Sequence, residues 1–443
     1  MFLQKIVASN RTAADAFGRS VSIDGDRIVV GAEYADTNNT NFGGPGAAYI
    51  FKRNANNVWE EEQIIVSTDL GYSDHFGCSV SISGETVVIG SYGEEEDGLG
   101  NNTIERSGSA YVFELNSSGN WYQKQKLVAS DRGWRNEFGL SVAIDKKTIV
   151  CGARGNLQER GSAYIFEKNS TGFFVQTERV VSDSAINGDN FGSSVAVDSN
   201  TVVVGAYLKR LIDPNDPARG TTGSAYVFQK SVNGSWRLEK RLAHSTPRMA
   251  NQFGFDVAID YPNVIVTGFA GTGVCGSDTN IGSGAVYLFK RIAPNQWIEA
   301  DNIIARNGVR NTYFGRGISI DGSTILIGDP DEEKDENGAN TITSAGAAYF
   351  YTTPGYHVSV KENKVPISYS VFPNPNTGKC TLQLEKEQDL TSIFISDING
   401  RVIKEITPKK TLNYEIHFEG TSGIYFLNIL SENASKTIKL IKK

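Results

Sequence analysis

The sequence predicts an all-β protein, namely a β-propeller of six recognisable four-stranded blades followed by a small immunoglobulin-like β-sandwich. The first reason is a Phe-Gly pair that recurs about every 60 residues over most of the chain. The second is that each pair precedes two apolar strand-like segments and a segment of the Gly-Ser-Ala-Tyr-Val-Phe type, always in this order. A fixed period with a fixed internal order indicates a repeat protein, whose units bury their apolar faces against their neighbours.

Residues of the same type recur at four fixed positions of the repeat. The Phe-Gly pairs begin at Phe17, Phe76, Phe138, Phe191, Phe253 and Phe314. A glycine follows near the end of the second predicted strand, at Gly31, Gly90, Gly152, Gly205, Gly268 and Gly328. The third predicted strand ends at Phe51, Phe113, Phe166, Phe228, Phe289 and Tyr351. A large aromatic residue then lies in the fourth strand at Trp59, Trp121, Phe174, Trp236 and Trp297.

Each unit is predicted to form four antiparallel strands. In the first strand, Val21 and Ile23 alternate with serines, which is typical of a strand with one apolar face. Asp24-Gly25 then makes a tight turn, because both residue types accept the backbone angles of a hairpin. The second strand is rich in β-branched residues. The third strand has apolar residues on both faces, as in a sheet that is covered on both sides. Such sheets pack as propeller blades, and we expect the Phe of each pair to fill the space between them.

The sixth unit lacks the aromatic residue of a fourth strand. Residues 3–9, Leu-Gln-Lys-Ile-Val-Ala-Ser, match the end of the fourth strands elsewhere in the chain. We therefore expect this segment to supply the missing strand and to close a ring of six blades without an exposed edge. The alternative is a ring of seven, in which a further blade and a signal peptide lie upstream of this chain.

These motifs resemble the FG-GAP repeat, known from the seven-bladed propeller of integrin α subunits and from many bacterial surface proteins. The resemblance covers residues 1–352 and implies the propeller fold. Family members that bind calcium carry an Asp-x-Asp-x-Asp-Gly type of loop between the first two strands, whereas this chain has only a tight turn there. No cofactor is predicted. Acidic runs at 94–97 and 329–336 leave calcium as an alternative without a dedicated motif, and a solvated charge run is the simpler interpretation.

A linker at residues 353–365 leads to residues 366–443, which resemble the C-terminal sorting domain of the type IX secretion system of Bacteroidota. The resemblance rests on Phe372-Pro373-Asn374-Pro375, on Ile393-Phe394-Ile395-Ser396-Asp397 followed by Asn399-Gly400-Arg401, on Ser422-Gly423-Ile424-Tyr425 and on the basic end of the chain. Short alternating strands with Asn-Gly and Ser-Gly turns predict a small β-sandwich. The resemblance implies that the type IX secretion machinery recognises residues 366–443 and that the protein is secreted or held at the cell surface.

Composition and motifs argue against several other functions. The net charge of −7 does not suit nucleic-acid binding, which needs a basic face. No apolar run is long enough for a transmembrane segment. The four cysteines are isolated and the four histidines are scattered, so neither a metal nor a redox motif is predicted. Because nucleophile, metalloprotease and phosphate-binding motifs are missing from the sequence as well, we predict that the protein is not an enzyme.

The connections between the second and third strands vary most in length, and in a propeller they emerge on one face. Together with the connections between blades they carry aromatic and basic residues on a rigid scaffold, which suits a binding surface. The predicted ligand-binding residues are Tyr34, Tyr92, Trp134, Arg154, Tyr207 and Phe269. The alternative is that these rings only cover the edges of the blades.

The sequence thus predicts a secreted or cell-surface, non-catalytic binding or adhesion protein whose loop face takes an extracellular glycan or protein. One alternative is a structural surface component that binds copies of itself. A less favoured alternative is a propeller hydrolase that acts on extracellular polysaccharide.

Overall fold

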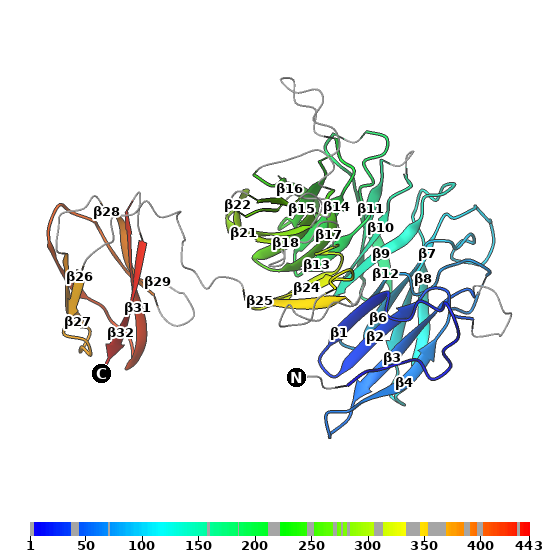
Figure 1. Cartoon of the computed structure of the whole chain (residues 1–443), viewed down its shortest axis with the longest axis horizontal. Coiled ribbons are helices and arrows are strands. Elements are labelled where there is room, and N and C mark those ends of the chain that lie inside the picture. Colours follow the sequence, from blue (N-terminus) through cyan, green and yellow to red (C-terminus); the bar gives the residue numbers. More distant parts are fainter. Residues whose placement is uncertain are drawn as a thin grey trace. The chain divides into compact units, whose positions relative to one another are not determined.

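The computed structural model divides into two compact units, Met1–Thr353 and Pro354–Lys443, and all its named elements are β-strands (Figure 1). The residues that it describes are 4–36, 44–69, 71–156, 160–184, 186–210, 222–245, 252–268, 273–275, 278–280, 284–304, 313–333, 346–352, 369–384, 390–396, 402–431 and 435–443. The predicted all-β class is confirmed.

Six antiparallel sheets follow one another along the first unit, as their colours show in Figure 1. The first has β1 (Ser20–Asp24), β2 (Arg27–Ala32), β3 (Ala47–Arg53) and β4 (Trp59–Ile65). The second has β5 (Val80–Ser83), β6 (Thr86–Ser91), β7 (Ser109–Leu115) and β8 (Trp121–Leu127). The third has β9 (Phe138–Asp145), β10 (Thr148–Ala153), β11 (Ser162–Lys168) and β12 (Phe174–Val180).

The fourth sheet has β13 (Val195–Asp198), β14 (Thr201–Ala206), β15 (Ser224–Lys230) and β16 (Trp236–Leu242). The fifth has β17 (Phe253–Asp260), β18 (Asn263–Gly268), β21 (Ala285–Ala293) and β22 (Gln296–Ile304), with a hairpin of β19 (Gly273–Cys275) and β20 (Asp278–Asn280) between its second and third strands. The sixth has β23 (Ile318–Asp321), β24 (Thr324–Asp329) and β25 (Ala347–Thr352). Each of the first five sheets thus forms the four strands that the sequence predicts.

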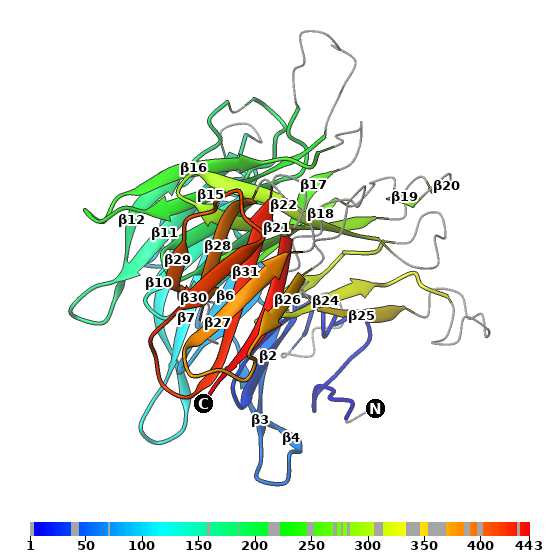
Figure 2. The ribbon, with the colours of Figure 1, turned by 90° about the vertical axis from the view of Figure 1, so that its left-hand side faces the viewer.

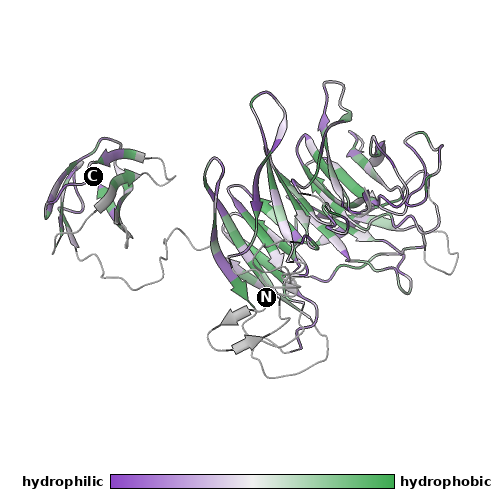
Figure 3. Cartoon of the chain, turned by 90° about the horizontal axis from the view of Figure 1, so that it is seen from above, coloured by the Kyte–Doolittle hydropathy of each residue, from purple (hydrophilic) through white to green (hydrophobic). Residues whose placement is uncertain are grey.

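The repeated Phe-Gly pair lies at the junction between successive sheets. Phe76 is fully buried and contacts Tyr111 of its own sheet edge to face, with 5.4 Å between the ring centroids. The same core cluster contains Ile50 of the preceding sheet, so the ring fills space between two sheets. A backbone bridge also joins Phe76 to Gly46, at the end of the loop before β3. Apolar colour accordingly follows the strands in Figure 3.

The glycine near the end of the second strand lets neighbouring sheets approach closely at Gly31, Gly90, Gly152 and Gly205. A Cβ atom on Gly90 would lie 1.9 Å from the carbonyl oxygen of Gly139 in the next sheet. Gly139 belongs to a Phe-Gly pair and has a φ of +83°, in the left-handed region that glycine adopts most readily. Both glycines of the repeat are therefore required by packing between backbones.

The first strands of neighbouring sheets are joined by a ladder of hydrogen bonds from backbone to side chain. In each bond, a backbone N–H of the later sheet donates to a serine or aspartate side chain of the earlier sheet. The bonds are Val80 to Ser20 (2.8 Å), Ile82 to Ser22 (3.1 Å), Gly84 to Asp24 (2.6 Å), Val142 to Ser79 (3.0 Å), Ile144 to Ser81 (3.1 Å), Lys146 to Ser83 (3.0 Å), Ser199 to Asp145 (2.8 Å), Val257 to Ser194 (3.2 Å), Tyr261 to Asp198 (2.7 Å), Ile318 to Asp256 (3.1 Å) and Gly322 to Asp260 (2.6 Å). The ladder explains why serine and aspartate alternate with apolar residues in these strands.

The two end sheets each have an uncovered apolar face. Val21 and Ile23 of β1 are 64% and 63% exposed, whereas their counterparts Val80 and Ile82 are both 5% exposed. Phe350 of β25 is 75% exposed, although the equivalent positions in the other sheets are buried. Closure of a ring, with six blades or with seven, stays a prediction.

The N-terminal segment packs against the first sheet. Gln4 donates to the carbonyl oxygen of Trp59 and accepts from its N–H, both at 2.7 Å. Gln63 of β4 binds the backbone of Trp121 in the next sheet in the same way, at 2.8 and 2.9 Å. Gln4 therefore contacts the first sheet as a fourth-strand residue of a preceding sheet would. The described residues before Ser20 form no strand of their own, and the predicted pairing of this segment with the sixth sheet stays a prediction.

The second unit is a β-sandwich. One sheet has β26 (Tyr369–Phe372), β27 (Lys379–Leu384) and β30 (Asn413–His417). The other has β28 (Leu390–Ser396), β29 (Val402–Ile406), β31 (Gly423–Ser431) and β32 (Ser435–Lys442). Leu382, Ile416, Ile395 and Leu427 from the two sheets share one core, and Figure 2 looks onto these layers. The predicted sandwich is confirmed.

Candidate functional site

Two positions of the repeat bring side chains together at one end of the sheets. One is the residue before the Phe of the Phe-Gly pair, which has a positive φ at Ala16, His75, Glu137, Asn190 and Gln252. The other is the residue that follows the second strand, at Glu33, Tyr92, Arg154 and Tyr207. Since positive φ is unusual for residues other than glycine, the turn before the Phe is a special local geometry that recurs in each of these sheets.

Three consecutive sheets pair the two positions through direct contacts. His75 stacks on Tyr92, with 4.5 Å between the ring centroids. The Nε of Arg154 donates to Oε2 of Glu137 at 2.7 Å. The Nδ2 of Asn190 donates to the hydroxyl of Tyr207 at 3.0 Å. Each sheet thus presents one preassembled pair.

Further contacts link the pairs of neighbouring sheets into one surface. Tyr34 meets His75 edge to face at 5.3 Å, and the guanidinium of Arg106 lies 5.1 Å from the Tyr92 ring. Arg106 Nη2 also pairs with Glu137 at 3.0 Å. Tyr207 meets Phe255 of the fifth sheet at 5.6 Å. We call this surface the loop-face band, and it consists of Tyr34, His75, Tyr92, Arg106, Glu137, Arg154, Asn190, Tyr207 and Phe255.

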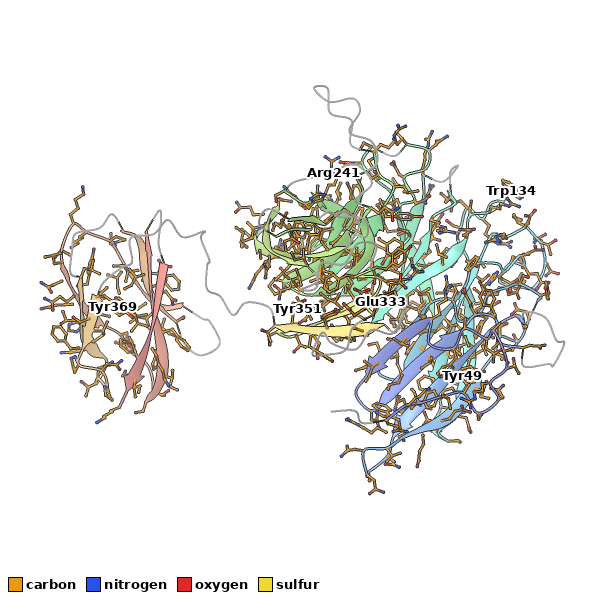
Figure 4. The ribbon with its side chains drawn as sticks, viewed as in Figure 1. Tyr49, Trp134, Arg241, Glu333, Tyr351 and Tyr369 are labelled. Carbon is orange, nitrogen blue, oxygen red and sulfur yellow. The ribbon has the colours of Figure 1, made fainter. Side chains whose placement is uncertain are left out.

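The band opens into a cavity of about 650 Å³ at the third and fourth sheets. Its lining residues are Trp134, Arg135, Asn136, Glu137, Arg154, Gly155, Asn190 and Tyr207. A Cβ atom on Gly155 would lie 1.9 Å from the carbonyl oxygen of Arg135, so this glycine lets two loops meet at the wall. Trp134 is 64% exposed and lies at the periphery of the first unit in Figure 4. The volume falls in the range of ligand sites, which is about 300–1,000 Å³.

Ion pairs fix the charged groups of this cavity. Arg154 and Arg106 share the carboxylate of Glu137. Burial acts to lower the pKa of Arg154, but the charge and hydrogen bond of Glu137 raise it above its usual value, so the side chain stays cationic. Arg135 pairs with Glu105 at 2.9 Å, and Trp134 Nε1 donates to the same carboxylate at 3.2 Å. These hydrogen bonds lower the pKa of Glu105.

At the first and second sheets, burial shifts the pKa values of Glu33 and His75. Glu33 is 1% exposed and pairs with Arg19 at 2.8 Å, yet burial raises the pKa of its carboxyl group. Burial lowers the pKa of His75 to about 4, and the nearby positive charges of Arg106 and Arg19 add to this effect. His75 is therefore a neutral stacking partner for Tyr92 at pH 7.

We expect an NMR titration of His75 to give a midpoint near pH 4, the pKa to which burial and the two arginines lower this group. Because the unfolded value is 6.5, the unfolded chain takes up this proton first as the pH falls. The stability that the neutral ring contributes is therefore lost between about pH 6.5 and pH 4. His75→Gln should remove this part of the acid sensitivity, and a midpoint near pH 6.5 in the folded protein would contradict the assignment.

The structure brings together three of the predicted ligand-binding residues, since Trp134, Arg154 and Tyr207 line the same cavity. Tyr34 and Tyr92 lie along the band at the first two sheets, joined by His75. Phe269 lies outside the described residues. Ligand binding by these residues stays a prediction.

The sequence analysis missed five of the nine residues in the band, namely His75, Arg106, Glu137, Asn190 and Phe255. Glu137, Asn190 and His75 all occupy the position before the Phe, and comparing that position across the repeats would have found them. Arg106 follows no such register. It lies in the connection between β6 and β7 and meets Glu137 of the next sheet only through the packing of the two sheets.

The acidic run at 94–97 forms part of an ion-paired cluster. Oxygen atoms of Asp69, Glu94 and Glu96 lie within 4.8 Å of one another. The Nζ of Lys126 lies 2.6 Å from Asp69 Oδ2 and 3.3 Å from Glu94 Oε1. The hydroxyl of Tyr111 also donates to Asp69 and Glu94, at 2.9 and 2.8 Å. The ammonium group of Lys126 thus already pairs with two of the three carboxylates that a calcium ion would need.

We expect calcium at millimolar concentration to change the melting temperature by less than about 1 °C, because binding would have to displace Lys126. Thermal unfolding with added calcium and with a chelator measures this difference. Lys126→Met is the matched variant, since it removes the ammonium while keeping the length of the side chain. A rise of several degrees in the unaltered protein would show that calcium competes successfully with the lysine.

Consecutive antiparallel sheets, joined through Phe-Gly pairs and followed by a separate sandwich, define the class of this protein as a β-sheet repeat protein. A family model described as the FG-GAP repeat matches residues 1–51, 59–113, 121–166, 174–228 and 297–351. The chain therefore belongs to the FG-GAP repeat family. Each match after the first runs from the aromatic residue of one sheet's fourth strand to the end of the third strand in a later sheet. No curated protein matches the chain.

The second unit determines where the protein is delivered. A family model described as the secretion system C-terminal sorting domain matches residues 370–443. The chain is therefore exported by type IX secretion to the cell surface or the extracellular space, and this unit interacts with the secretion machinery. Among the described residues, none forms a helix that is long and apolar enough to cross a membrane.

Proposed function

We propose that the protein is a non-catalytic binding or adhesion protein, whose loop-face band takes an extracellular glycan or protein. The observation that carries this proposal is the cavity at the third and fourth sheets, where Trp134, Arg154 and Tyr207 lie together. Aromatic faces beside fixed polar groups are the usual composition of a ligand site. Export to the surface or the extracellular space places such a site where these ligands occur.

The chemistry of the cavity supports binding over catalysis. Hydrolysis of a glycosidic bond commonly uses two carboxyl groups on opposite sides of the bond. Among the described residues that line this cavity there is one carboxylate, Glu137. Arg106 and Arg154 already hold it in ion pairs, so the described lining does not offer two free carboxyl groups on opposite sides of a ligand.

The proposal is tested by screening the full-length chain against glycan and matrix-protein arrays. For any ligand found, Trp134→Ala and Tyr207→Ala should weaken binding at least about tenfold, which corresponds to about 1.4 kcal/mol. The melting temperature of Trp134→Ala should stay unchanged, because the ring is 64% exposed. Phe173→Ala is the matched control, since this ring is 43% exposed in the turn between β11 and β12. Binding that survives both cavity variants would exclude the cavity as the site.

A second candidate function is self-association as a structural surface component. The uncovered faces of the end sheets favour it, because Val21, Ile23 and Phe350 occupy positions that are buried or half-buried at the other junctions between sheets. A second copy could cover them with the same contacts. Sedimentation velocity over a range of concentrations tests this candidate: assembly that Phe350→Asp abolishes would support it, and a monomer at all concentrations would exclude it.

A further inference from the structure

We propose that the cavity at the third and fourth sheets takes an anionic sugar, that is, a sugar that carries a carboxylate or a sulfate group. The inference rests on the proposed function, because it names the ligand class of the same cavity. Three features carry it: the balance of charge in the lining, the donors that Arg154 keeps available, and two fixed aromatic faces.

The described residues that line the cavity carry a net positive charge, although the chain as a whole is anionic. These residues include Arg135 and Arg154 and a single carboxylate, that of Glu137. When the bonded neighbours Arg106 and Glu105 are included, three guanidinium groups face two carboxylates. The complete chain has a net charge of −7, so the local excess of positive charge is set by these side chains. An anion entering the cavity would meet an unbalanced positive charge.

Arg154 is placed to bind that anion. Among the described residues, its hydrogen bond to Glu137 uses Nε, and no hydrogen bond is recorded for its two terminal nitrogens. The side chain is 37% exposed, so these donors can reach a ligand. A guanidinium group donates in a planar fork that matches the oxygens of a carboxylate or a sulfate. Glu137 holds one edge of the group and thereby orients the rest.

Two aromatic rings give the cavity the character of a sugar site. Trp134 is held by its hydrogen bond to Glu105 and by the guanidinium of Arg135, which lies 4.6 Å from the ring. Tyr207 is held by Asn190 and by edge-to-face contact with Phe255. The rings therefore lose little freedom when a ligand binds, and their apolar faces suit the C–H face of a pyranose ring.

The concave shape favours a sugar over an acidic protein segment. A cavity of about 650 Å³ matches the size of a compact ligand. A protein partner commonly buries a much wider surface, about 800 Å² on each side. A neutral sugar would use the rings but would leave the excess positive charge without a counterpart. An anionic sugar uses both the rings and the charge.

The test measures binding of four probes to the full-length chain by calorimetry at low salt. The probes are a tetramer of galacturonic acid, the same tetramer as its methyl ester, a sulfated tetrasaccharide and a poly-glutamate peptide. We expect at least one of the two anionic sugars to bind. If the acidic tetramer is that ligand, its methyl ester should bind at least about tenfold more weakly, because esterification removes the charge and keeps the ring.

Arg154→Gln should lower the affinity for the anionic sugar about tenfold and should leave the weak affinity for the methyl ester unchanged. Arg19→Gln is the matched control, because it breaks an arginine–glutamate pair outside the cavity and should not change binding. Raising the salt concentration should weaken the binding of the anionic sugar and should leave the binding of the methyl ester unchanged. The comparison of the uronate with the sulfated probe shows which anion the site prefers.

The failures of the inference and of the proposed function are distinguishable. If a neutral sugar or the peptide binds best and Trp134→Ala abolishes that binding, the inference is wrong and the proposed function stands. If equal affinities are found for the acid and its ester, the charge of the cavity plays no part and the inference is again wrong. If no probe and no arrayed ligand binds in a manner that depends on Trp134, both proposals are overturned.

Discussion

Phe191→Ala is expected to lower the free energy of unfolding by about 3–5 kcal/mol, the usual cost of removing a buried phenylalanine ring. Phe191 is fully buried and contacts Tyr226 and Phe228 edge to face, with ring centroids 5.3 and 6.1 Å away. Its core cluster contains Ile165 of the third sheet and Val204 of the fourth. The substitution therefore opens a cavity at the junction between two sheets, where rigid strands limit collapse.

Urea denaturation followed by tryptophan fluorescence measures this change. Phe173→Ala removes the same number of atoms from a ring that is 43% exposed, and it should cost less than about 1 kcal/mol. The comparison separates burial from residue type. Equal effects of the two substitutions would show that the Phe of the Phe-Gly pair is not the core residue that its position indicates.

Gly205→Ala is expected to destabilise the protein by about 3 kcal/mol, because it inserts an atom between two backbones. The added Cβ would lie 2.1 Å from the carbonyl oxygen of Gly254 in the next sheet, and no side-chain rotation relieves that contact. Gly254 has a φ of +91°, which holds this carbonyl in place. The fourth and fifth sheets would have to move apart, which would also weaken the hydrogen bond from Tyr261 to Asp198.

Gly328→Ala is the matched control, since it makes the same change at the same position of the sixth sheet. A Cβ there would come no closer than 3.6 Å to its neighbours, because none of the sheets that the structure describes follows the sixth one in the first unit. Its cost should stay within about 0.5 kcal/mol, as for most exposed substitutions. If both substitutions destabilise the protein equally in thermal unfolding, the sixth sheet is covered in solution, and the ring is closed by contacts beyond those described.

The repetition of the sequence made most of the strands predictable. Positions such as Gly31 or Phe51 recur in every unit because each unit packs against its neighbours in the same way. A pattern that occurs six times does not arise by chance. The Phe-Gly pair is explained in the same way, since its ring fills a junction and its glycine accepts a close neighbour. Residues that occur in one unit only cannot be found by comparing the units.

The candidate site was predictable only where it follows the repeat. Arg154 and Tyr207 were found because the position after the second strand could be compared between units. Glu137 and His75 could have been found by the same comparison at the position before the Phe, but the positive φ of that turn is not indicated by their residue types. The pairing of Arg106 with Glu137 arises from two sheets that meet in space, so no spacing in the sequence encodes it.

The ladder between the first strands gives the array of sheets a direction. Every link runs from an N–H of the later sheet to a side-chain oxygen of the earlier one, as in the bond from Ile82 to Ser22. The first strand at the start of the array therefore offers backbone N–H donors, whereas the first strand at its end offers side-chain oxygen acceptors. Because bonds of this kind recur at every junction, each sheet presents acceptors to the sheet that follows it and donors to the sheet that precedes it.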